Sequence, residues 1–103
     1  MIPRMERDAI LATLQANRAA LRQRGVMHVA LFGSLARDEA GPGSDIDLLL
    51  DLDPAAPIDV FGYAGLLDVL RGMFAGRVVD VADRQALKPR LRPRIEREAI
   101  LAF

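Results

Sequence analysis

The spacing of apolar side chains along the 103-residue chain alternates between a helical and an extended period. Helical spacing predicts a helix over residues 5–24 that is ended by Gly25, with apolar side chains at Met5, Ile10, Leu11, Leu14 and Leu21. Short β-rich apolar runs predict strands over residues 26–32, 45–52 and 78–82. The remaining segments predict a helical turn over 34–39, a loop over 41–44, a helix over 58–75, and a helical tail from Gln85 that breaks near Pro89 and ends in a helix from Pro93 to Phe103. This alternation predicts an α/β fold with a small sheet.

Length and composition narrow the class of protein. A chain of 103 residues, of which 51% are hydrophobic, suffices for one globular domain, which we expect to span residues 1–103. Fourteen Lys and Arg balance fourteen Asp and Glu, so the net charge of zero argues against nucleic acid as a direct ligand. The apolar runs are too short to span a membrane, and the lack of cysteine fits a reducing compartment, so we expect a cytoplasmic protein.

Two carboxylates stand at the start of the second predicted strand. Side chains alternate along a strand, so Asp45 and Asp47 share one face, whereas Ile46, Leu48 and Leu50 point the other way, into the core. Two like charges on one face repel each other, and a hard divalent cation relieves that repulsion. Carboxylates without a nearby histidine or cysteine favour Mg²⁺, or Mn²⁺, over zinc. The alternative is a solvated strand edge, which a bare Asp-x-Asp pattern does not exclude.

Two further features favour a ligand site over a solvated edge. Gly33 ends the first predicted strand, where a glycine lets the backbone approach a ligand closely, and the helical turn after Ser34 offers N–H groups to phosphate oxygens. Asp80 interrupts the third predicted strand, where a charge is costly unless it is paired or bound to a metal. Together these residues predict a nucleotide–metal site. Other acidic candidates lie closer to strand ends, where solvation costs little: Asp51, Asp53 and Asp83.

The segment "FGSLARDEAGPGSDIDLLL" (residues 32–50) resembles the signature of the DNA polymerase β-like nucleotidyltransferases, a Gly-Ser pair followed by Asp-x-Asp. The chain length, and a motif strand that starts near residue 27, are similar to the minimal nucleotidyltransferases, which are antitoxins encoded beside HEPN-domain toxins. The order of elements and the later Asp80 strand extend the resemblance over nearly the whole chain. The resemblance implies a small mixed sheet flanked by helices.

The same resemblance implies nucleotidyl transfer, in which an acceptor hydroxyl attacks the α-phosphorus of ATP and pyrophosphate leaves. It implies that Asp45 and Asp47 hold two Mg²⁺ ions, with Mn²⁺ as a substitute. Asp80 would complete the site for one of these ions and draw the proton from the hydroxyl. Gly33 and Ser34 would hold the β- and γ-phosphates.

Three residues around this motif have open alternatives. Arg37 either reaches the triphosphate, which a guanidinium matches well, or pairs with a neighbouring carboxylate such as Glu39. Ser44 either supports the metal-binding loop and the nucleotide or is a plain turn serine. Asp38 stands where the family often has a glycine, and an acidic side chain that faced the phosphates would oppose nucleotide binding.

Larger members of the family that the sequence resembles use a second domain to bind the acceptor, and we expect none in these 103 residues. We therefore expect the acceptor to come from another macromolecule or from a second copy. The resemblance implies that it is a hydroxyl, on a tyrosine of a cognate HEPN ribonuclease toxin, within a hetero-oligomer of the two proteins. Two alternatives stay open: a non-catalytic antitoxin that neutralises its partner by binding, and a transferase that acts on a small molecule.

Overall fold

The computed structural model describes residues 3–39, 41 and 43–103. Pro42 of the predicted loop and the side chain of Met5 lie outside the described part. The helices and strands follow in the order α1 (Pro3–Ala16), α2 (Arg18–Gln23), β1 (Val26–Phe32), α3 (Gly33–Ala36), β2 (Ile46–Leu52), α4 (Val60–Met73), β3 (Val79–Asp83), the 3₁₀ helix η1 (Arg84–Ala86), α5 (Arg92–Glu98) and β4 (Ile100–Leu101). None of the described helices is both long and apolar enough to cross a membrane.

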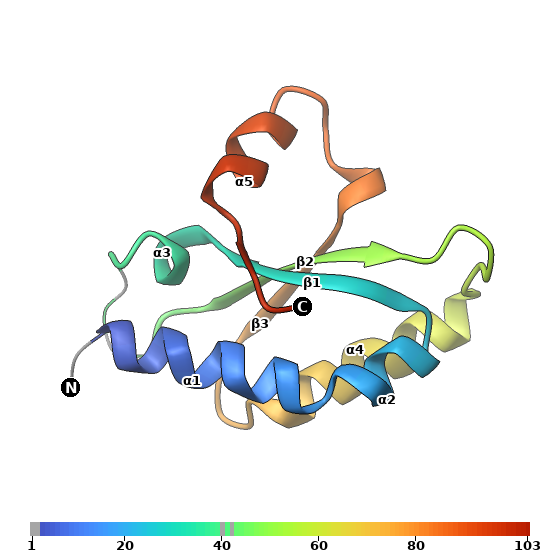
Figure 1. Cartoon of the computed structure of the whole chain (residues 1–103), viewed down its shortest axis with the longest axis horizontal. Coiled ribbons are helices and arrows are strands. Elements are labelled where there is room, and N and C mark those ends of the chain that lie inside the picture. Colours follow the sequence, from blue (N-terminus) through green and yellow to red (C-terminus); the bar gives the residue numbers. More distant parts are fainter. Residues whose placement is uncertain (1–2, 40, 42) are drawn as a thin grey trace.

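Across the described residues, four strands form one mixed sheet in the order β3-β2-β1-β4. β1 is antiparallel to both β2 and β4, whereas β2 and β3 are parallel and are connected by α4. Helices α1, α2 and α4 cover one face of the sheet, and α5 lies on the opposite side (Figure 1). The predicted α/β fold, with a small mixed sheet flanked by helices, is confirmed.

The core lies between the sheet and the face covered by α1, α2 and α4. Ile46, Leu48 and Leu50 of β2 are completely buried there, as the alternation of the sequence predicts. They pack in one cluster with Leu66 and Leu70, which are four residues apart and therefore on the same side of α4. Because these alternate residues fill the core, the side chains between them face the α5 side of the sheet.

The predicted first helix is divided at Asn17. The Asn17 backbone N–H donates to the Thr13 carbonyl, and the side-chain Nδ2 donates to the same carbonyl at 2.8 Å. Asn side chains compete for backbone groups in this way and favour helix ends, so α1 stops at Ala16 and α2 starts at Arg18. Gly25 follows α2 with a φ of +94°, as expected of a glycine that ends a helix.

The prediction of a final helix that reaches Phe103 is wrong. α5 ends at Glu98, and the chain then enters β4, where Leu101 pairs with Ala30 and Ile100 pairs with Leu31. Phe103 is 8% exposed and belongs to the core. Pairing with β1 and burial of this aromatic side chain outweigh the local helical preference of the segment.

Candidate active site

Strand pairing brings three of the predicted site residues together at one end of the sheet. Phe32, the last residue of β1, pairs with Asp47 of the antiparallel β2, so the turn at Gly33 lies beside Asp47. Asp47 in turn pairs with Asp80 on the parallel β3. Paired residues of neighbouring strands point to the same face of a sheet, so both carboxylates lie on the face opposite α1, α2 and α4. Asp45 directly precedes β2 and is exposed.

Position 33 requires glycine for two reasons, its backbone conformation and its close contact with Asp47. Its φ of +76° lies in the left-handed region, which side chains other than glycine rarely adopt. A Cβ atom at this position would overlap the Oδ2 atom of Asp47 and come within 3.0 Å of its Cγ atom. The backbone at the end of β1 is therefore in direct contact with the carboxylate, as the sequence pattern predicts for a glycine at a ligand site.

The charge of Asp47 is unfavourable in this environment. Partial burial raises the pKa of the Asp47 carboxyl, and the negative charges of Asp80 and Asp45 raise this pKa further. The Arg37 guanidinium acts in the opposite direction and lowers the pKa of Asp47. Three carboxylates thus interact across one small region, and the pKa of Asp47 is raised despite the positive charge of Arg37.

This donor set has the chemistry that Mg²⁺ or Mn²⁺ prefers, because it consists of carboxylate oxygens without nitrogen or sulfur ligands. Within residues 3–39, 41 and 43–103, no three acidic, histidine or cysteine side chains converge closely enough to ligate one ion as they stand. Asp45, Asp47 and Asp80 are therefore close neighbours rather than a closed ligand cage. A cation shared among them would offset the repulsion that raises the pKa of Asp47.

The two predicted serines have different positions. Ser34 is half-buried in the first turn of α3, directly after Gly33. The Ser44 hydroxyl donates to the Gly41 carbonyl at 2.8 Å, and the Ser44 N–H donates to the same carbonyl. Ser44 therefore stabilises the turn that leads into Asp45, in accord with the alternative of a turn serine.

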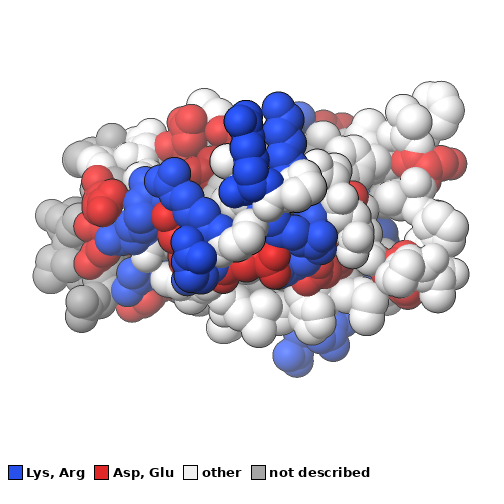
Figure 2. Space-filling model, turned by 90° about the horizontal axis from the view of Figure 1, so that it is seen from above, with Lys and Arg blue, Asp and Glu red and all other residues white. Residues whose placement is uncertain are grey.

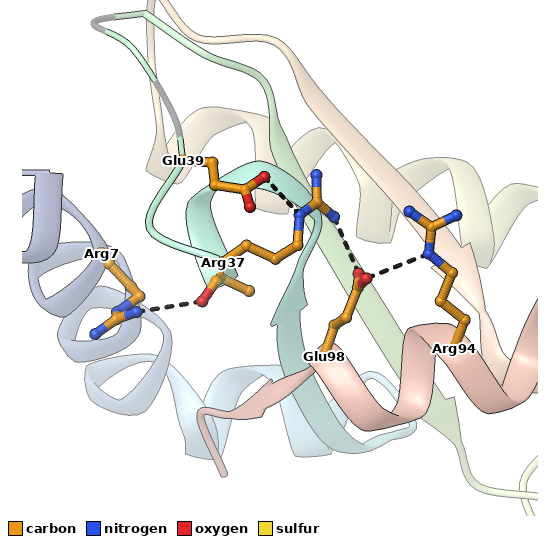
Figure 3. A network of polar contacts seen from close by, with 6 residues as sticks. Arg7, Arg37, Glu39, Arg94 and Glu98 are labelled. Atoms are coloured by element: carbon orange, nitrogen blue, oxygen red, sulfur yellow. Dashed lines mark hydrogen bonds and ion pairs between the residues drawn. The ribbon is translucent and has the colours of Figure 1, made fainter.

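Arg37 pairs with carboxylates on two segments, as Figure 3 shows. Its Nε donates to Glu39 and its NH1 donates to Glu98 of α5, both at 3.0 Å. Arg94 also donates to Glu98, at 3.3 Å. Burial alone would raise the pKa of Glu98, yet the hydrogen bonds from Arg94 and Arg37 lower it. The predicted alternative of pairing with Glu39 is confirmed, and Glu98 is a second partner that the sequence did not indicate.

Helix α5 places charges of both signs over the open face of the sheet. Seen from above, Lys and Arg side chains gather over the middle of this face, with Asp and Glu beside and between them (Figure 2). Within α5, Arg92 pairs with Glu96 and Arg94 pairs with Glu98, each four residues apart. These i,i+4 pairs are those expected on a solvated helix surface.

Asp38 has a backbone conformation that favours glycine. Its φ is +62°, the one positive φ among the described residues other than glycine. Asp is among the few residues that tolerate this left-handed conformation, although glycine adopts it at lower cost. The side chain of Asp38 is exposed. The substitution is thus compatible with the backbone of this turn.

All three rival carboxylates have other contacts. Asp51 accepts a hydrogen bond from Arg84 Nε at 2.7 Å. Asp83 caps η1 by accepting from the Gln85 N–H at 3.0 Å. Asp53 accepts from the Ala55 N–H at 2.9 Å in the turn after β2. All three belong to the opposite end of β2 and β3 from Asp47 and Asp80, as their positions near strand ends indicate.

Comparison with known proteins agrees with this arrangement. A family model described as a nucleotidyltransferase domain matches residues 15–102. A Methanocaldococcus jannaschii protein assigned as a protein adenylyltransferase is 35% identical over 86 residues, which cover 78% of this chain and 83% of that protein. The protein adenylyltransferase MntA of Thermococcus cleftensis is 30% identical over 94 residues, which cover 90% of this chain and 92% of that protein.

Solved structures have the same fold. One described as a minimal nucleotidyltransferase has a TM-score of 0.69 and 34% identity, and covers 97% of this chain and 95% of its own. A toxin–antitoxin structure with AMP-PNP has a TM-score of 0.65 and covers 94% of this chain and 72% of its own; at 19% identity it shows the fold alone. The fold is that of the minimal nucleotidyltransferases. The chain belongs to the nucleotidyltransferase domain family, and the resemblance seen in the sequence is confirmed.

Proposed function

We propose that this chain is a metal-dependent protein adenylyltransferase and antitoxin, which transfers AMP from ATP to a tyrosine hydroxyl of a cognate HEPN ribonuclease toxin. The observation that carries the proposal is the group of three carboxylates around Asp47, which lies beside Gly33, because burial and the charges of Asp80 and Asp45 raise the pKa of Asp47 and a bound cation would offset this cost. Relatives that bear the name protein adenylyltransferase support the reaction class. The fold shared with a toxin–antitoxin structure that contains AMP-PNP supports the donor and the biological setting.

In this proposal each residue of the candidate site has its own role in the in-line displacement at the α-phosphorus. Asp45 and Asp47 would hold two Mg²⁺ ions, and Asp80 would complete the ligand set of one of them. These ions, when bound, stabilise the negative charge on the attacking and leaving oxygens. Gly33 and Ser34 present their backbone to the β- and γ-phosphates.

Transfer of AMP to the hydroxyl forms one bond, breaks one bond and moves one proton. The acceptor oxygen forms a bond to the α-phosphorus, and the bond breaks between that phosphorus and the oxygen that joins the α- and β-phosphates, which leaves with pyrophosphate. Asp80 accepts the proton that the hydroxyl loses. The products are an adenylylated acceptor and pyrophosphate. Arg37 contacts the phosphates once it leaves the carboxylates of Glu39 and Glu98.

A protein acceptor fits the surface of the molecule. Val60 and Phe61, at the start of α4, have exposed fractions of 79% and 87%. Neighbouring large apolar side chains exposed to this degree are typical of surfaces that bind another protein. In this proposal Val60 and Phe61 contribute to the contact with the toxin.

The test is intact-mass spectrometry of the neighbour-encoded partner after co-expression with this chain. We expect an increase of one AMP when the wild type is present and none when the D45N/D47N variant is present. Asparagine keeps the shape of each side chain while it removes the negative ligand, so the variant should fold. Size-exclusion chromatography of both complexes is the control for partner binding.

Two outcomes would contradict the proposal. An AMP addition made equally well by D45N/D47N would mean that the site lies elsewhere. Neutralisation of the partner by both forms, without any added mass, would instead show an antitoxin that acts by binding alone.

A further inference from the structure

Arg77, two residues before β3, connects two segments that are far apart in the sequence. Its NH1 group pairs with Glu6 of α1, 71 positions away. Its NH2 group donates to the backbone carbonyl of Ser44, 33 positions away. Its Nε is buried and has no hydrogen-bond partner among the described residues, so these two contacts alone orient the guanidinium. No pattern around Arg77 in the sequence indicates either partner.

The Ser44 carbonyl matters because it belongs to the peptide unit that joins Ser44 to Asp45. A hydrogen bond to this oxygen fixes the plane of that peptide and hence the direction in which the Asp45 side chain leaves the backbone. On the other side of Asp45, the Ile46 N–H donates to the Val78 carbonyl at 2.9 Å. Arg77 and Val78, two consecutive residues, therefore hold the backbone on both sides of Asp45.

Asp45 depends on this backbone support. Its side chain is exposed, and no hydrogen bond to its carboxylate is present among the described residues. By contrast, Asp47 is half-buried within β2 and is fixed by its strand neighbours and by contact with Gly33. Of the two proposed metal ligands in the Asp-x-Asp pair, Asp45 is thus the one whose position the sheet does not itself determine.

Arg77 acts on the backbone next to Asp45, and its charge is paired with Glu6. Arg37 is the cation that lowers the pKa of Asp47, whereas the charge of Arg77 is compensated by Glu6. The two acceptors of Arg77 lie on different segments and use two different terminal nitrogens. A guanidinium can span two acceptors in this way because its N–H groups form a rigid fork, and a lysine ammonium cannot reproduce that fork.

We propose that Arg77 is a positioning residue for the metal site, which holds the Ser44–Asp45 peptide so that the Asp45 carboxylate faces Asp47 and Asp80. This role rests on the proposed function, because it assumes that the three carboxylates bind a divalent cation. Groups that orient metal ligands from outside the coordination sphere are typically worth 10- to 100-fold in metal affinity.

The test compares Arg77→Lys, Arg77→Gln and Glu6→Gln with the wild type. Mn²⁺ titration followed by electron paramagnetic resonance measures metal affinity, and thermal unfolding measures stability. We expect Arg77→Lys and Arg77→Gln to weaken Mn²⁺ binding about tenfold. Glu6→Gln removes the ion pair to α1 but leaves the bond to Ser44, so it should lower the melting temperature with less than about a twofold change in Mn²⁺ affinity. Arg77→Lys keeps the charge and serves as the variant of choice if Arg77→Gln does not fold.

Hydrogen exchange of the Asp45 and Ile46 amides gives a readout that needs neither metal nor turnover. Faster exchange at these amides in Arg77→Lys, but not in Glu6→Gln, would support the positioning role. Wild-type exchange rates together with wild-type Mn²⁺ affinity in both Arg77 variants would overturn it. If the wild type itself does not bind Mn²⁺, the proposed metal chemistry fails, and the role of Arg77 at Asp45 is decided by the exchange rates alone.

Discussion

Asp47 combines three features that rarely occur in one side chain. It is half-buried, it has two carboxylate neighbours, and it touches a backbone that only glycine allows. Burial and the two carboxylate neighbours make its negative charge costly in the folded protein, and neither is needed to form β2. We infer that the cost persists because the charge serves the proposed metal site rather than the fold.

Asp47→Asn should therefore stabilise the protein while it abolishes transfer. In metal-free buffer at pH 7, we expect the free energy of unfolding to rise by roughly 0.5 kcal/mol, a small value because solvent screens a half-exposed group. Urea unfolding with a chelator present measures this effect, and Mg²⁺ should stabilise the wild type but not the variant. Asp68→Asn, at an exposed position of α4, is the matched control and should show neither effect.

The pH dependence of the stability gained by Asp47→Asn follows from the direction in which the pKa of Asp47 shifts on folding. Because the pKa of Asp47 is raised on folding, the folded state binds this proton more tightly than the unfolded state does. The stability that the protonated carboxyl contributes is complete below about pH 4 and is lost as the pH rises through the raised pKa. The advantage of Asp47→Asn should accordingly vanish at pH 4, and an advantage that is independent of pH would contradict this explanation.

The ion pairs of Arg37, which connect the end of α3 to α5, set the position of its side chain. Glu98 holds one side of its guanidinium and Glu39 the other, so in the proposed reaction a triphosphate has to compete with both carboxylates. Arg94 holds Glu98 in turn. Access of Arg37 to the nucleotide thus depends on a helix that contributes none of the predicted site residues.

Glu98→Gln should strengthen ATP binding a few-fold, because it removes the charge that competes for Arg37. Isothermal titration calorimetry with a non-hydrolysable ATP analogue measures this affinity. Glu96→Gln is the matched control on the same helix, since Glu96 pairs with Arg84 and Arg92 and not with Arg37. Equal or weaker binding by Glu98→Gln would mean that Arg37 does not contact the phosphates.

Local patterns were sufficient to predict most of the fold and the strand positions of the carboxylates. The period of two in β2 placed Ile46 and Asp47 on opposite faces, and Gly33 marked the close approach at the end of β1. Sequence patterns failed to predict structure that depends on contacts between residues far apart in the sequence. The pairing of β4 with β1 depends on contacts across about seventy residues, so the segment after Glu98 looked like a continued helix.

The same limit applies to the candidate site. Sequence spacing predicted which carboxylates share a face, because strand geometry alone decides that. It did not reveal Glu98 or Arg77, whose partners Arg37 and Ser44 become neighbours only when the whole sheet is assembled. Glycine in relatives at the place of Asp38 suggested an effect on charge, whereas the backbone shows a conformational reason, a left-handed φ of +62°.

Phe103 ties the end of the described chain to the rest of the molecule. Its ring lies in the core, with the Arg22 guanidinium 5.6 Å from the ring centre, and its carbonyl accepts from the Val29 N–H at 3.2 Å. Through β4 and Phe103, the chain therefore covers the edge of β1 that faces away from β2.

Phe103→Ala should lower the free energy of unfolding by about 3 kcal/mol, as expected when a buried aromatic side chain is truncated. Phe61→Ala is the matched control, because Phe61 is exposed and its loss should change stability by less than about 0.5 kcal/mol. Urea unfolding of both variants measures the difference. Similar stability losses in the two variants would show that Phe103 is not a core residue in solution.

The late position of β4 has a consequence for synthesis on the ribosome. His28 of β1 contacts the Phe103 carbonyl, and these two residues are 75 positions apart. At a synthesis rate of about 5–20 residues per second, the outer edge of β1 stays unpaired for roughly 4–15 seconds after it is translated. During this time its free N–H and C=O groups can pair with another nascent chain. Neighbouring ribosomes on one messenger RNA would bring such edges together, so the sheet is most exposed to misassembly before β4 has been translated.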